Sequence, residues 1–413
     1  MSSLTASVPL WPATRAEIAP LIRLVLPIVA GLAASTLIGV VDTVMIAPLG
    51  TVPLAAASLT TATIIIFYSA IYGFMSAVGI EAAHRHGAGD AAGVAASLRA
   101  GLVLALVAGV IGAALMALVL LALPWLGQPA EVLAVIAPYW LAMCGLLVPV
   151  ALLMVISQVL NAMDRPWTAA GFAFLGVVLN VPLNYTLIWG IGGWPGLGLL
   201  GAGLASLAAD TLALIVALVW LARQGLLRAP QVAGLRGRLA RGGVPLAIGY
   251  TGEGAAYALV GVMLGVFGAT ALAANQIVQA VGGVLYMLPL GMAAAVAIRI
   301  GQASGAADPA RLRPIALAAI GVVTAWMVAV TVALIQVADG VQSTALGALR
   351  GAMDFHWPTR FTLICYWLFA LPLAAALGFG AELGPLGGWA GYGIGIAVVA
   401  VVLPWRFWRL TAG

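Results

Sequence analysis

Long apolar runs recur through this chain, and they constrain its fold more than any other feature. Runs of about 20 residues, the length that the hydrocarbon core of a bilayer requires of a helix, recur from Leu24 to Trp405. They are unbroken, without the alternation of period two that marks a membrane β-strand. Only 7% of the 413 residues are charged, against roughly 25% in an ordinary globular domain. The sequence therefore predicts an all-α polytopic membrane protein and excludes a cytoplasmic enzyme.

The apolar runs predict about twelve transmembrane helices in two sets of six. The first set lies roughly at residues 24–48, 54–80, 98–123, 132–160, 168–190 and 199–222. The second set lies roughly at residues 244–267, 272–298, 314–331, 333–350, 361–380 and 390–405. We therefore expect an N-terminal lobe at residues 1–222, a cytoplasmic linker at 223–243 and a C-terminal lobe at 244–413.

All 17 basic residues are arginines, and they occur in every second loop. Five fill the expected linker, whereas the alternate loops, such as 48–53 and 124–131, contain none. Because basic residues stay in cytoplasmic loops, we expect a multi-pass protein of the cytoplasmic (inner) membrane with both termini in the cytoplasm. The arginines do not gather on one face, so the net charge of +5 does not indicate nucleic-acid binding.

Neither an enzyme active site nor a site for a resident cofactor is indicated by the sequence. The three histidines lie in expected loops and show no metal-ligand spacing and no pairing with a nucleophile. Cys144 and Cys365 both lie inside apolar runs, so no disulfide framework is expected.

The second half of the chain repeats the first. The stretch 27–90 aligns with the stretch 245–308 without a gap. In a second register, Met163-Asp164 aligns with Met353-Asp354. Parallel repeats of this kind put a transport path at the interface between the halves. We therefore expect two six-helix lobes of the same orientation.

The two registers differ, because the chain between Asp308 and Asp354 is shorter than its counterpart between Asp90 and Asp164. The shortfall is about 28 residues, roughly the length of one transmembrane helix. Arginines still flank the segment on both sides, which argues for an even number of crossings. Two crossings of about 18 residues each just reach the lower limit of ~17 residues for a transmembrane helix. We therefore expect helices 9 and 10 to be shortened, with a single long or re-entrant helix as the alternative.

Five acidic residues lie within the spans, where a charge costs ~2.5–3.5 kcal/mol on insertion scales and indicates function by default. They are Asp42, Glu81, Asp210, Glu253 and Asp339. Glu81 lies beside His84 and Arg85 at an expected cytoplasmic end, where solvation or pairing accounts for it. Asp210 lies in mid-span, four residues after Ser206, and belongs to no motif that we identify.

Oxygen-bearing side chains accompany Asp42 in the first half. Asn180 and Asn184 lie one turn apart on the fifth span and therefore share a face, and Ser206 follows in the sixth. One carboxylate with amide and hydroxyl oxygens suits a hard monovalent cation, by analogy with the oxygen shells of calcium and magnesium. We expect these four residues to couple transport to a cation or proton, with Na⁺ as the candidate metal. The alternative is a carboxyl that its neighbours satisfy within a polar seam.

The second half carries its acids at different positions. Glu253 lies in mid-span among glycines, which let a backbone, a water file or a ligand approach closely. The repeat pairs Glu253 with Ser35, whereas Asp42 corresponds to Val260. Asp339 begins a polar stretch beside the shortfall. The halves are therefore expected to be alike in build and different in charge.

Several motifs together resemble the MATE (multidrug and toxic compound extrusion) transporters, most of all their NorM branch. In chain order they are Pro27, Val41-Asp42-Thr43-Val44-Met45, Leu49-Gly50, Leu54-Ala55-Ala56, Gly87-Ala88-Gly89-Asp90, Asn180-Val181-Pro182-Leu183-Asn184-Tyr185, the copy at 245–308, Asp339-Gly340-Val341-Gln342 and Leu349-Arg350-Gly351. The resemblance implies a twelve-helix, two-lobed, V-shaped fold that exports bulky organic cations against sodium or proton entry.

The resemblance also assigns site residues. It points to the Asp42 group as the cation site of the first lobe, with Ser206 in place of the family's usual threonine. It points to Glu253 and Asp339 as the acidic pair of the second lobe, and we expect these two acids to take part in coupling transport to a cation or proton as well. The shortfall beside Asp339 departs from the family pattern.

Six further side chains are weaker candidates for lining a substrate path, because aromatic and methionine side chains stack on flat cations. They are Tyr68, Tyr257, Gln276, Gln279, Tyr286 and Met287. A carboxylate in such a path can take up a proton, a sodium ion or a cationic drug in competition, and each exchange biases the packing of the lobes. We expect a monomeric, secondary active multidrug efflux transporter, whose partners are small organic cations and the lipid bilayer.

Three alternatives remain open. A lipid or lipid-linked oligosaccharide flippase of the same superfamily would line its cavity with several arginines, whereas the arginines here lie at span ends. A channel would need a ring or a re-entrant filter, which is not visible. The shortfall also leaves open an inactive homologue with a defective second lobe.

Overall fold

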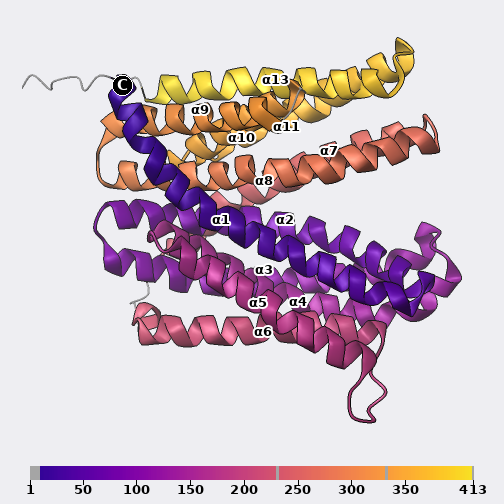
Figure 1. The fold of residues 1–413 in the computed structure, drawn as a ribbon. Coiled ribbons are helices and arrows are strands. Elements are labelled where there is room, and N and C mark those ends of the chain that lie inside the picture. The colour runs from indigo at the N-terminus through magenta and orange to yellow at the C-terminus, as the bar shows by residue number, and fades with distance from the viewer. Residues whose placement is uncertain (1–9, 229–231, 331–333, 412–413) are drawn as a thin grey trace, which may run out of the picture. The chain divides into compact units, whose positions relative to one another are not determined.

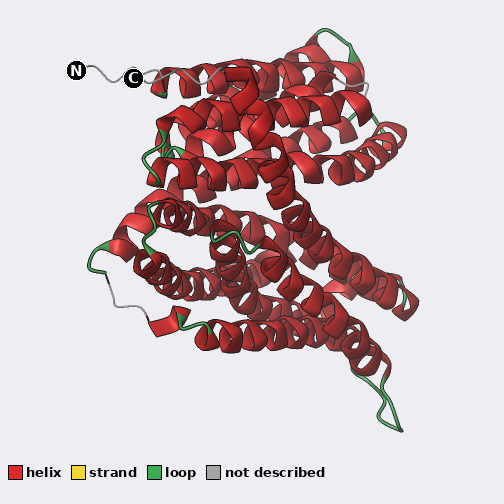
Figure 2. Ribbon diagram, turned by 60° about the vertical axis from the view of Figure 1, so that its left-hand side comes forward, coloured by secondary structure: helices red, strands yellow, loops and turns green. Residues whose placement is uncertain are grey.

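The computed structural model describes residues 10–228, 232–330 and 334–411, and these ranges contain helices and no strands (Figures 1 and 2). The helices of the first half are α1 (Leu10–Ile46), α2 (Thr51–Gly87), α3 (Ala91–Ala122), α4 (Ala130–Ala162), α5 (Pro166–Trp189) and α6 (Leu199–Arg223). Those of the second half are α7 (Leu235–Gly265), α8 (Ala269–Gly305), α9 (Leu312–Val330), α10 (Leu334–Gly351), α11 (His356–Ile364), α12 (Leu371–Ala375) and α13 (Gly384–Leu410). Short 3₁₀ turns occur at Ala47–Leu49 (η1), Leu123–Leu126 (η2), Leu226–Arg228 (η3) and Pro309–Arg311 (η4).

The segment from His356 to Gly380 is one continuous helical rod. Two π-helical stretches, η5 (Cys365–Ala370) and η6 (Ala376–Gly380), alternate in it with α11 and α12. Counted as one helix, this rod brings the helices of the described ranges to twelve, which confirms the predicted all-α architecture.

Ten of these helices, within the ranges that the structure describes, are long and apolar enough to cross a membrane. The other two are α7 and α10, which carry Glu253 and Asp339. Their polar side chains lower the mean hydropathy, so the two helices outside this set are those with acids of the second half. The chain is thus a multi-pass membrane protein.

The shortened pair in the second half is confirmed as two separate helices. α9 has 19 residues and α10 has 18, against 32 in α3 and 33 in α4. At 1.5 Å per residue α9 is about 28 Å long and α3 about 48 Å. The missing residues therefore shorten both helices and remove neither.

Contacts between Cα atoms divide the chain into two compact units. Unit 1 comprises residues 1–29, 83–90 and 248–413, and unit 2 comprises residues 30–82 and 91–247. Each unit is described by itself below. The sequence division into 1–222, 223–243 and 244–413 stays a prediction.

In unit 1 the start of α1 is held by ion pairs to the second half of the chain. Glu17 of α1 accepts hydrogen bonds from Arg299 of α8 at 3.0 Å and from Arg311 of η4 at 2.7 Å. Its carboxylate is almost fully buried, and two guanidinium groups compensate for the loss of water there. These pairs explain why the first turns of α1 belong to unit 1.

In unit 2 the close approach of α3 and α4 depends on small side chains. A Cβ on Gly109 would lie 2.9 Å from the Cα of Val148, closer than packed atoms allow. About two turns away along these helices, Trp140 is fully buried and donates its indole N–H to the carbonyl of Met116 at 2.8 Å. α5 and α6 pack against α4 and against each other.

Candidate functional site

The four residues predicted for the first half meet in unit 2. Asn184 donates its Nδ2–H to Oδ1 of Asp42 at 2.6 Å, and Ser206 donates its hydroxyl to Oδ2 of Asp42 at 2.9 Å. Asn184 also donates to Oδ1 of Asn180 at 2.9 Å, and Asn180 donates to Oγ of Ser206 at 3.1 Å. We call this group the Asp42 cluster. It joins α1, α5 and α6.

Local sequence explains how the cluster assembles. Asn180 and Asn184 are four residues apart on α5, so both amides project from one face toward α6 and α1. Both are completely buried, and Ser206 is nearly so, whereas Asp42 is half-buried. The polar groups lie inside unit 2, where an unpaired carboxylate is costly and each neutral donor stabilises it.

One acceptor in the Asp42 cluster has no donor. Oδ1 of Asn184 is buried and, among the described residues, receives no hydrogen bond. It lies next to the amide nitrogen that holds Asp42. The described residues contain no group of three His, Cys, Asp or Glu side chains that could hold a metal ion. What the cluster offers is a single carboxylate with amide and hydroxyl oxygens, a set that suits a monovalent cation or a proton.

The acids predicted for the second half lie in unit 1 and have separate partners. Oε1 of Glu253 accepts a hydrogen bond from Nε2 of Gln342 at 3.0 Å, and Oε1 of Gln342 accepts one from the hydroxyl of Tyr366 at 2.6 Å. Oδ1 of Asp339 accepts a long hydrogen bond of 3.4 Å from the hydroxyl of Tyr286. We call this group the Glu253 cluster. It joins α7, α8, α10 and η5.

Asp339 is also held through its own helix. The hydroxyl groups of Tyr286 and Ser343 share a hydrogen bond, and Ser343 donates to the backbone carbonyl of Asp339 at 2.9 Å. The polar stretch that follows Asp339 therefore supplies Gln342 to the carboxylate of Glu253 and Ser343 to the backbone carbonyl of Asp339. The shortening of α10 leaves this network in place.

A buried arginine completes the Glu253 cluster, and the sequence analysis missed it. Arg350, in the last turn of α10, is 4% exposed, and its guanidinium lies 4.3 Å from the ring centroid of Tyr250. Tyr250 and Glu253 are three residues apart on α7 and share a face, and the guanidinium interacts electrostatically with Glu253. From the sequence, Arg350 appeared to belong to the solvated end of a span.

The surroundings of Arg350 contain several polar atoms without a partner. Among the described residues, Nε of Arg350 and the hydroxyl oxygens of Thr359 and Thr362 are buried and unpaired. Thr359 approaches α7 at Gly249, where a Cβ would lie 3.4 Å from its Oγ1 and 3.9 Å from Nη2 of Arg350. The guanidinium thus lies in a polar region of unit 1, packed on an aromatic face.

The six weaker candidates for a substrate path do not form one group. Tyr68 belongs to unit 2, and the others belong to unit 1. Tyr257 packs against the rings of Trp389 and Tyr392, with centroids 5.6 and 6.3 Å apart. Tyr286 bonds to Asp339 as described, and Met287 is half-buried. Gln279 faces Gly261 of α7, and the side chain of Gln276 lies outside the described residues.

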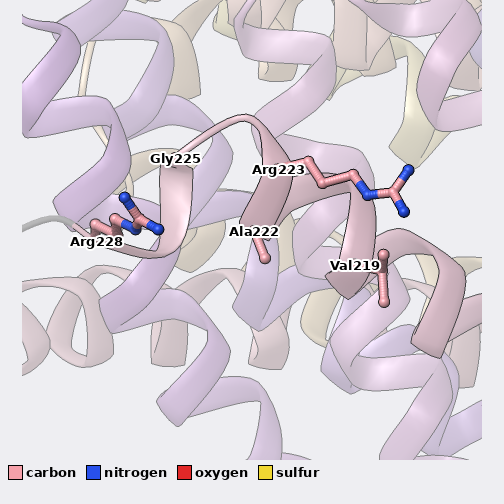
Figure 3. A pocket seen from close by; sticks show the side chains of 5 residues that line it. All are labelled: Val219, Ala222, Arg223, Gly225 and Arg228. Carbon is pink, nitrogen blue, oxygen red and sulfur yellow. The ribbon is translucent and has the colours of Figure 1, made fainter.

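An open pocket of about 410 Å³ lies elsewhere, at the C-terminal end of α6 and at η3 (Figure 3). It is lined by Val219, Ala222, Arg223, Gly225 and Arg228. In Figure 3 the guanidinium groups of Arg223 and Arg228 lie apart at opposite ends of this segment, so they do not converge on one ligand. None of the predicted site residues lines this pocket.

Comparisons with known proteins agree with this architecture. The chain is 32% identical to "Probable multidrug resistance protein NorM" of Rhodopseudomonas palustris, over 90% of this chain and 87% of that protein. It is 31% identical to the protein of the same name from Deinococcus radiodurans, over 97% of each chain. A solved structure described as "Crystal structure of MATE in the bent conformation" superposes with a TM-score of 0.87 at 20% identity, covering 98% of this chain and 100% of the other.

The family model MatE matches two stretches, residues 27–186 and 245–337. They begin at Pro27 and Pro245, which the sequence repeat places on each other. Each stretch also carries an acid of one of the two clusters, Asp42 in the first and Glu253 in the second. With the helical fold, the internal repeat and relatives along nearly its whole length, the chain belongs to the MatE family of membrane transporters and is not an enzyme.

Proposed function

We propose that the chain is a secondary active multidrug efflux transporter, which exports organic cations in exchange for sodium ions or protons. The observation that carries this proposal is the Asp42 cluster, a carboxylate inside a span whose direct partners are all neutral. The relatives are called multidrug resistance proteins, which supports the substrate class. The protein acts as a monomer in the cytoplasmic membrane with both termini in the cytoplasm, and its only cofactor is the coupling ion.

The Asp42 cluster can exchange its neutral donors for a cation. Without an ion, the N–H of Asn184 and the O–H of Ser206 stabilise the ionised carboxylate. The hydroxyl of Ser206 can rotate to present a lone pair, and Oδ1 of Asn184 is already an unpaired acceptor. A sodium ion therefore meets oxygens from three helices. A proton on Asp42 makes the carboxyl a donor, for which the same Oδ1 is an acceptor.

The Glu253 cluster provides acidic groups for the organic cation. Glu253 and Asp339 are half-buried, and tyrosine rings lie on α7, the helix of Glu253, and on α8, where Tyr286 bonds to Asp339. A cation binds there by charge and by stacking on aromatic faces. Each ligand shifts the conformational equilibrium only by its difference in affinity for the two states. Because the ion binds α1, α5 and α6, and the drug binds α7, α8 and α10, exchange of one for the other changes which helix packing is favoured.

The flippase alternative finds less support. Arg350 is the one buried arginine among the described residues, and its guanidinium already stacks on Tyr250. One occupied guanidinium is a poor site for a phosphate group, which bidentate arginines bind best. The inactive-homologue alternative also loses support, because α10 retains Asp339 with its partners despite its length.

The proposal is tested with purified protein in vesicles that contain a fluorescent organic cation. We expect dye export against its gradient when sodium or protons are supplied on the opposite side, and no export by Asp42→Asn. Sodium and proton gradients are imposed in separate vesicles, so the coupling ion is identified in the same experiment. The control is Glu131→Gln, an exposed acid in the first turn of α4. Export by Asp42→Asn at the wild-type rate would falsify the coupling role of the cluster.

A further inference from the structure

Asp210 is an acidic side chain in the middle of α6 that takes no part in the Asp42 cluster. It is half-buried, and none of the described residues donates a hydrogen bond to its carboxylate. Asp42 differs in this respect, because each of its oxygens accepts one. An ionisable group inside a span without a partner is costly and indicates a function.

Asp210 lies one helical turn from the Asp42 cluster on each helix that builds it. On α6 it follows Ser206 by four residues. Its Oδ1 lies 3.0 Å from where a Cβ on Gly176 would be, and Cδ1 of Ile38 lies 3.8 Å from the same point. Gly176 precedes the first asparagine of the cluster by four residues on α5, and Ile38 precedes Asp42 by four on α1. Asp210 therefore lies about 6 Å from the Asp42 cluster along the helices. We call the level of the Asp42 cluster the first layer and the level of Asp210 the second layer.

Because Gly176 has no side chain, it leaves the space that the carboxylate of Asp210 occupies. It is buried in the α5–α6 interface, and a methyl group there would come closer to Oδ1 of Asp210 than ordinary contact allows. Gly176 thus lies on the face of α5 that carries the two asparagines, at the level of Asp210. The position is shaped to hold the carboxylate against α5, on the same face that carries the Asp42 cluster.

No basic side chain among the described residues of unit 2 neutralises the two carboxylates. Asp42 and Asp210 interact electrostatically, and no basic side chain among the described residues contributes to the environment of either. The other titratable groups nearby are Tyr68 of α2, which interacts with both acids, and Tyr139 of α4, which interacts with Asp42. Two carboxylates in a poorly solvated seam cannot both stay ionised without positive charge between or beside them.

A second observation points to a ligand in this seam. Asn184 is completely buried, and its unpaired Oδ1 lies in the first layer. The two layers together therefore hold two carboxylates and a free amide oxygen, with no cation from the described residues to match them. Hard monovalent cations, either protons or sodium ions, are the chemical class that this set accepts.

We propose that Asp210 is a second cation-accepting carboxylate in unit 2, so that the unit exchanges one more monovalent cation per transport cycle than the Asp42 cluster alone. The proposal rests on the proposed function, because it adds an ion to the same exchange. Asp42 is the acid whose oxygens already have neutral donors. Asp210 is the acid with free lone pairs, one turn nearer to the end of α6 that carries Arg223.

The test is the dye gradient that a fixed ion gradient sustains in vesicles whose membrane potential is clamped at zero. For every tenfold ion gradient, loss of one exchanged cation lowers the sustained dye gradient by about tenfold. We expect this loss for Asp210→Asn in the sodium arm or in the proton arm, whichever ion drives export. Asp210→Glu, which keeps the carboxylate, is expected to restore the wild-type gradient, and Glu131→Gln is the unchanged control.

The outcomes separate this proposal from the one it rests on. If Asp210→Asn sustains the wild-type gradient in both arms while Asp42→Asn is inactive, Asp210 exchanges no cation and the proposal is overturned. If Asp42→Asn also exports dye, the proposed function fails instead.

If Asp210→Asn exports no dye, the number of cations bound per chain tests the proposal instead. Sodium or proton binding is measured on the detergent-purified protein after size-exclusion chromatography has shown a folded species. Loss of one bound cation per chain supports the proposal, and an unchanged number overturns it. Gly176→Ala is a second probe, because a methyl group pushes the carboxylate from its layer and is expected to lower the gradient in the same direction.

Discussion

The two polar clusters lie in repeated halves of one chain, and they balance their charges in different ways. In unit 2 Asp42 has neutral partners and Asp210 accepts no hydrogen bond, and no basic group among the described residues contributes to the environment of either carboxylate. In unit 1 the Glu253 cluster provides two carboxylates together with the buried guanidinium of Arg350. One cluster contains a cationic side chain of its own, and the other contains none among the described residues.

The difference in charge balance between the two clusters predicts which unit exchanges ions. A fixed guanidinium cannot leave, so it neutralises part of the acidic charge of unit 1 throughout the cycle. The acids of unit 2 have no such partner, so their charge changes with every ion that binds or leaves. We therefore expect the removal of charge to affect mainly stability in unit 1 and mainly ion coupling in unit 2.

The largest effect is expected from Arg350→Gln. Removing one side of a buried charge interaction costs about 3–5 kcal/mol, because the other charge is left without compensation. The free energy of unfolding, measured by denaturant titration in detergent micelles, should fall by this amount. Arg360→Gln, an exposed arginine of the same unit, is the control. A loss for Arg350→Gln no larger than that of the control contradicts the role of the guanidinium as a counter-charge.

The next effect compares the two principal acids directly. Glu253→Gln leaves Arg350 without its carboxylate and should lower the free energy of unfolding by about 2 kcal/mol. Asp42→Asn removes a charge that has no internal cation and should change it by less than about 1 kcal/mol. Both are measured by the same titration. Equal losses would show that the clusters are balanced alike. Combined with Arg350→Gln, the glutamine at 253 should recover part of the loss, which a double-mutant cycle measures.

A smaller effect is expected from Ser206→Ala. It removes the hydroxyl that donates to Asp42 and accepts from Asn180, which is worth about 1 kcal/mol, or roughly fivefold in ion affinity. The ion concentration that half-saturates dye export should rise by this factor. Ser206→Thr keeps the hydroxyl and should stay near the wild-type value. An unchanged half-saturation for the alanine variant would mean that the hydroxyl is no ligand.

The smallest effect is expected from Tyr286→Phe in unit 1. Its hydroxyl bonds to Asp339 at a long 3.4 Å and shares a hydrogen bond with Ser343, so its loss should cost about 0.5–1 kcal/mol. Ion dependence should not change, because this cluster has its own cation. The exposed Tyr185→Phe of α5 is the matched control for the unfolding titration. A shift in ion dependence for Tyr286→Phe would place ion exchange in unit 1 as well.

Much of the fold and part of the site follow from the sequence because they depend on lengths and periods. The shortfall between Asp308 and Asp354 predicts two short helices there, and α9 and α10 have 19 and 18 residues. Asn180 and Asn184 share a face by helical period alone. That Ser206 and Asp42 reach this face depends on helix packing, which the family resemblance supplied.

The rest depends on the direction in which a side chain points, which span length does not reveal. Arg350 lies at the end of a helix, where arginines commonly face water, yet it turns inward onto Tyr250. The partner of Gln342, Tyr366, lies in an apolar run with nothing to mark it in the sequence. Asp210 drew attention by its charge, but its relation to Gly176 appears only when α5 and α6 are packed.

The short pair α9 and α10 also has a consequence for the surrounding lipid. A helix of about 28 Å matches a hydrocarbon core of about 30 Å with almost no excess, so neither helix can tilt strongly and still cross it. The longer helices of the same chain can accommodate a thicker bilayer by tilting, whereas a crossing by either helix of this pair requires a bilayer no thicker than the helix is long. Hydrophobic mismatch therefore acts on one small part of the molecule, next to Asp339. The length of the lipid acyl chains is then expected to affect the surroundings of this acid.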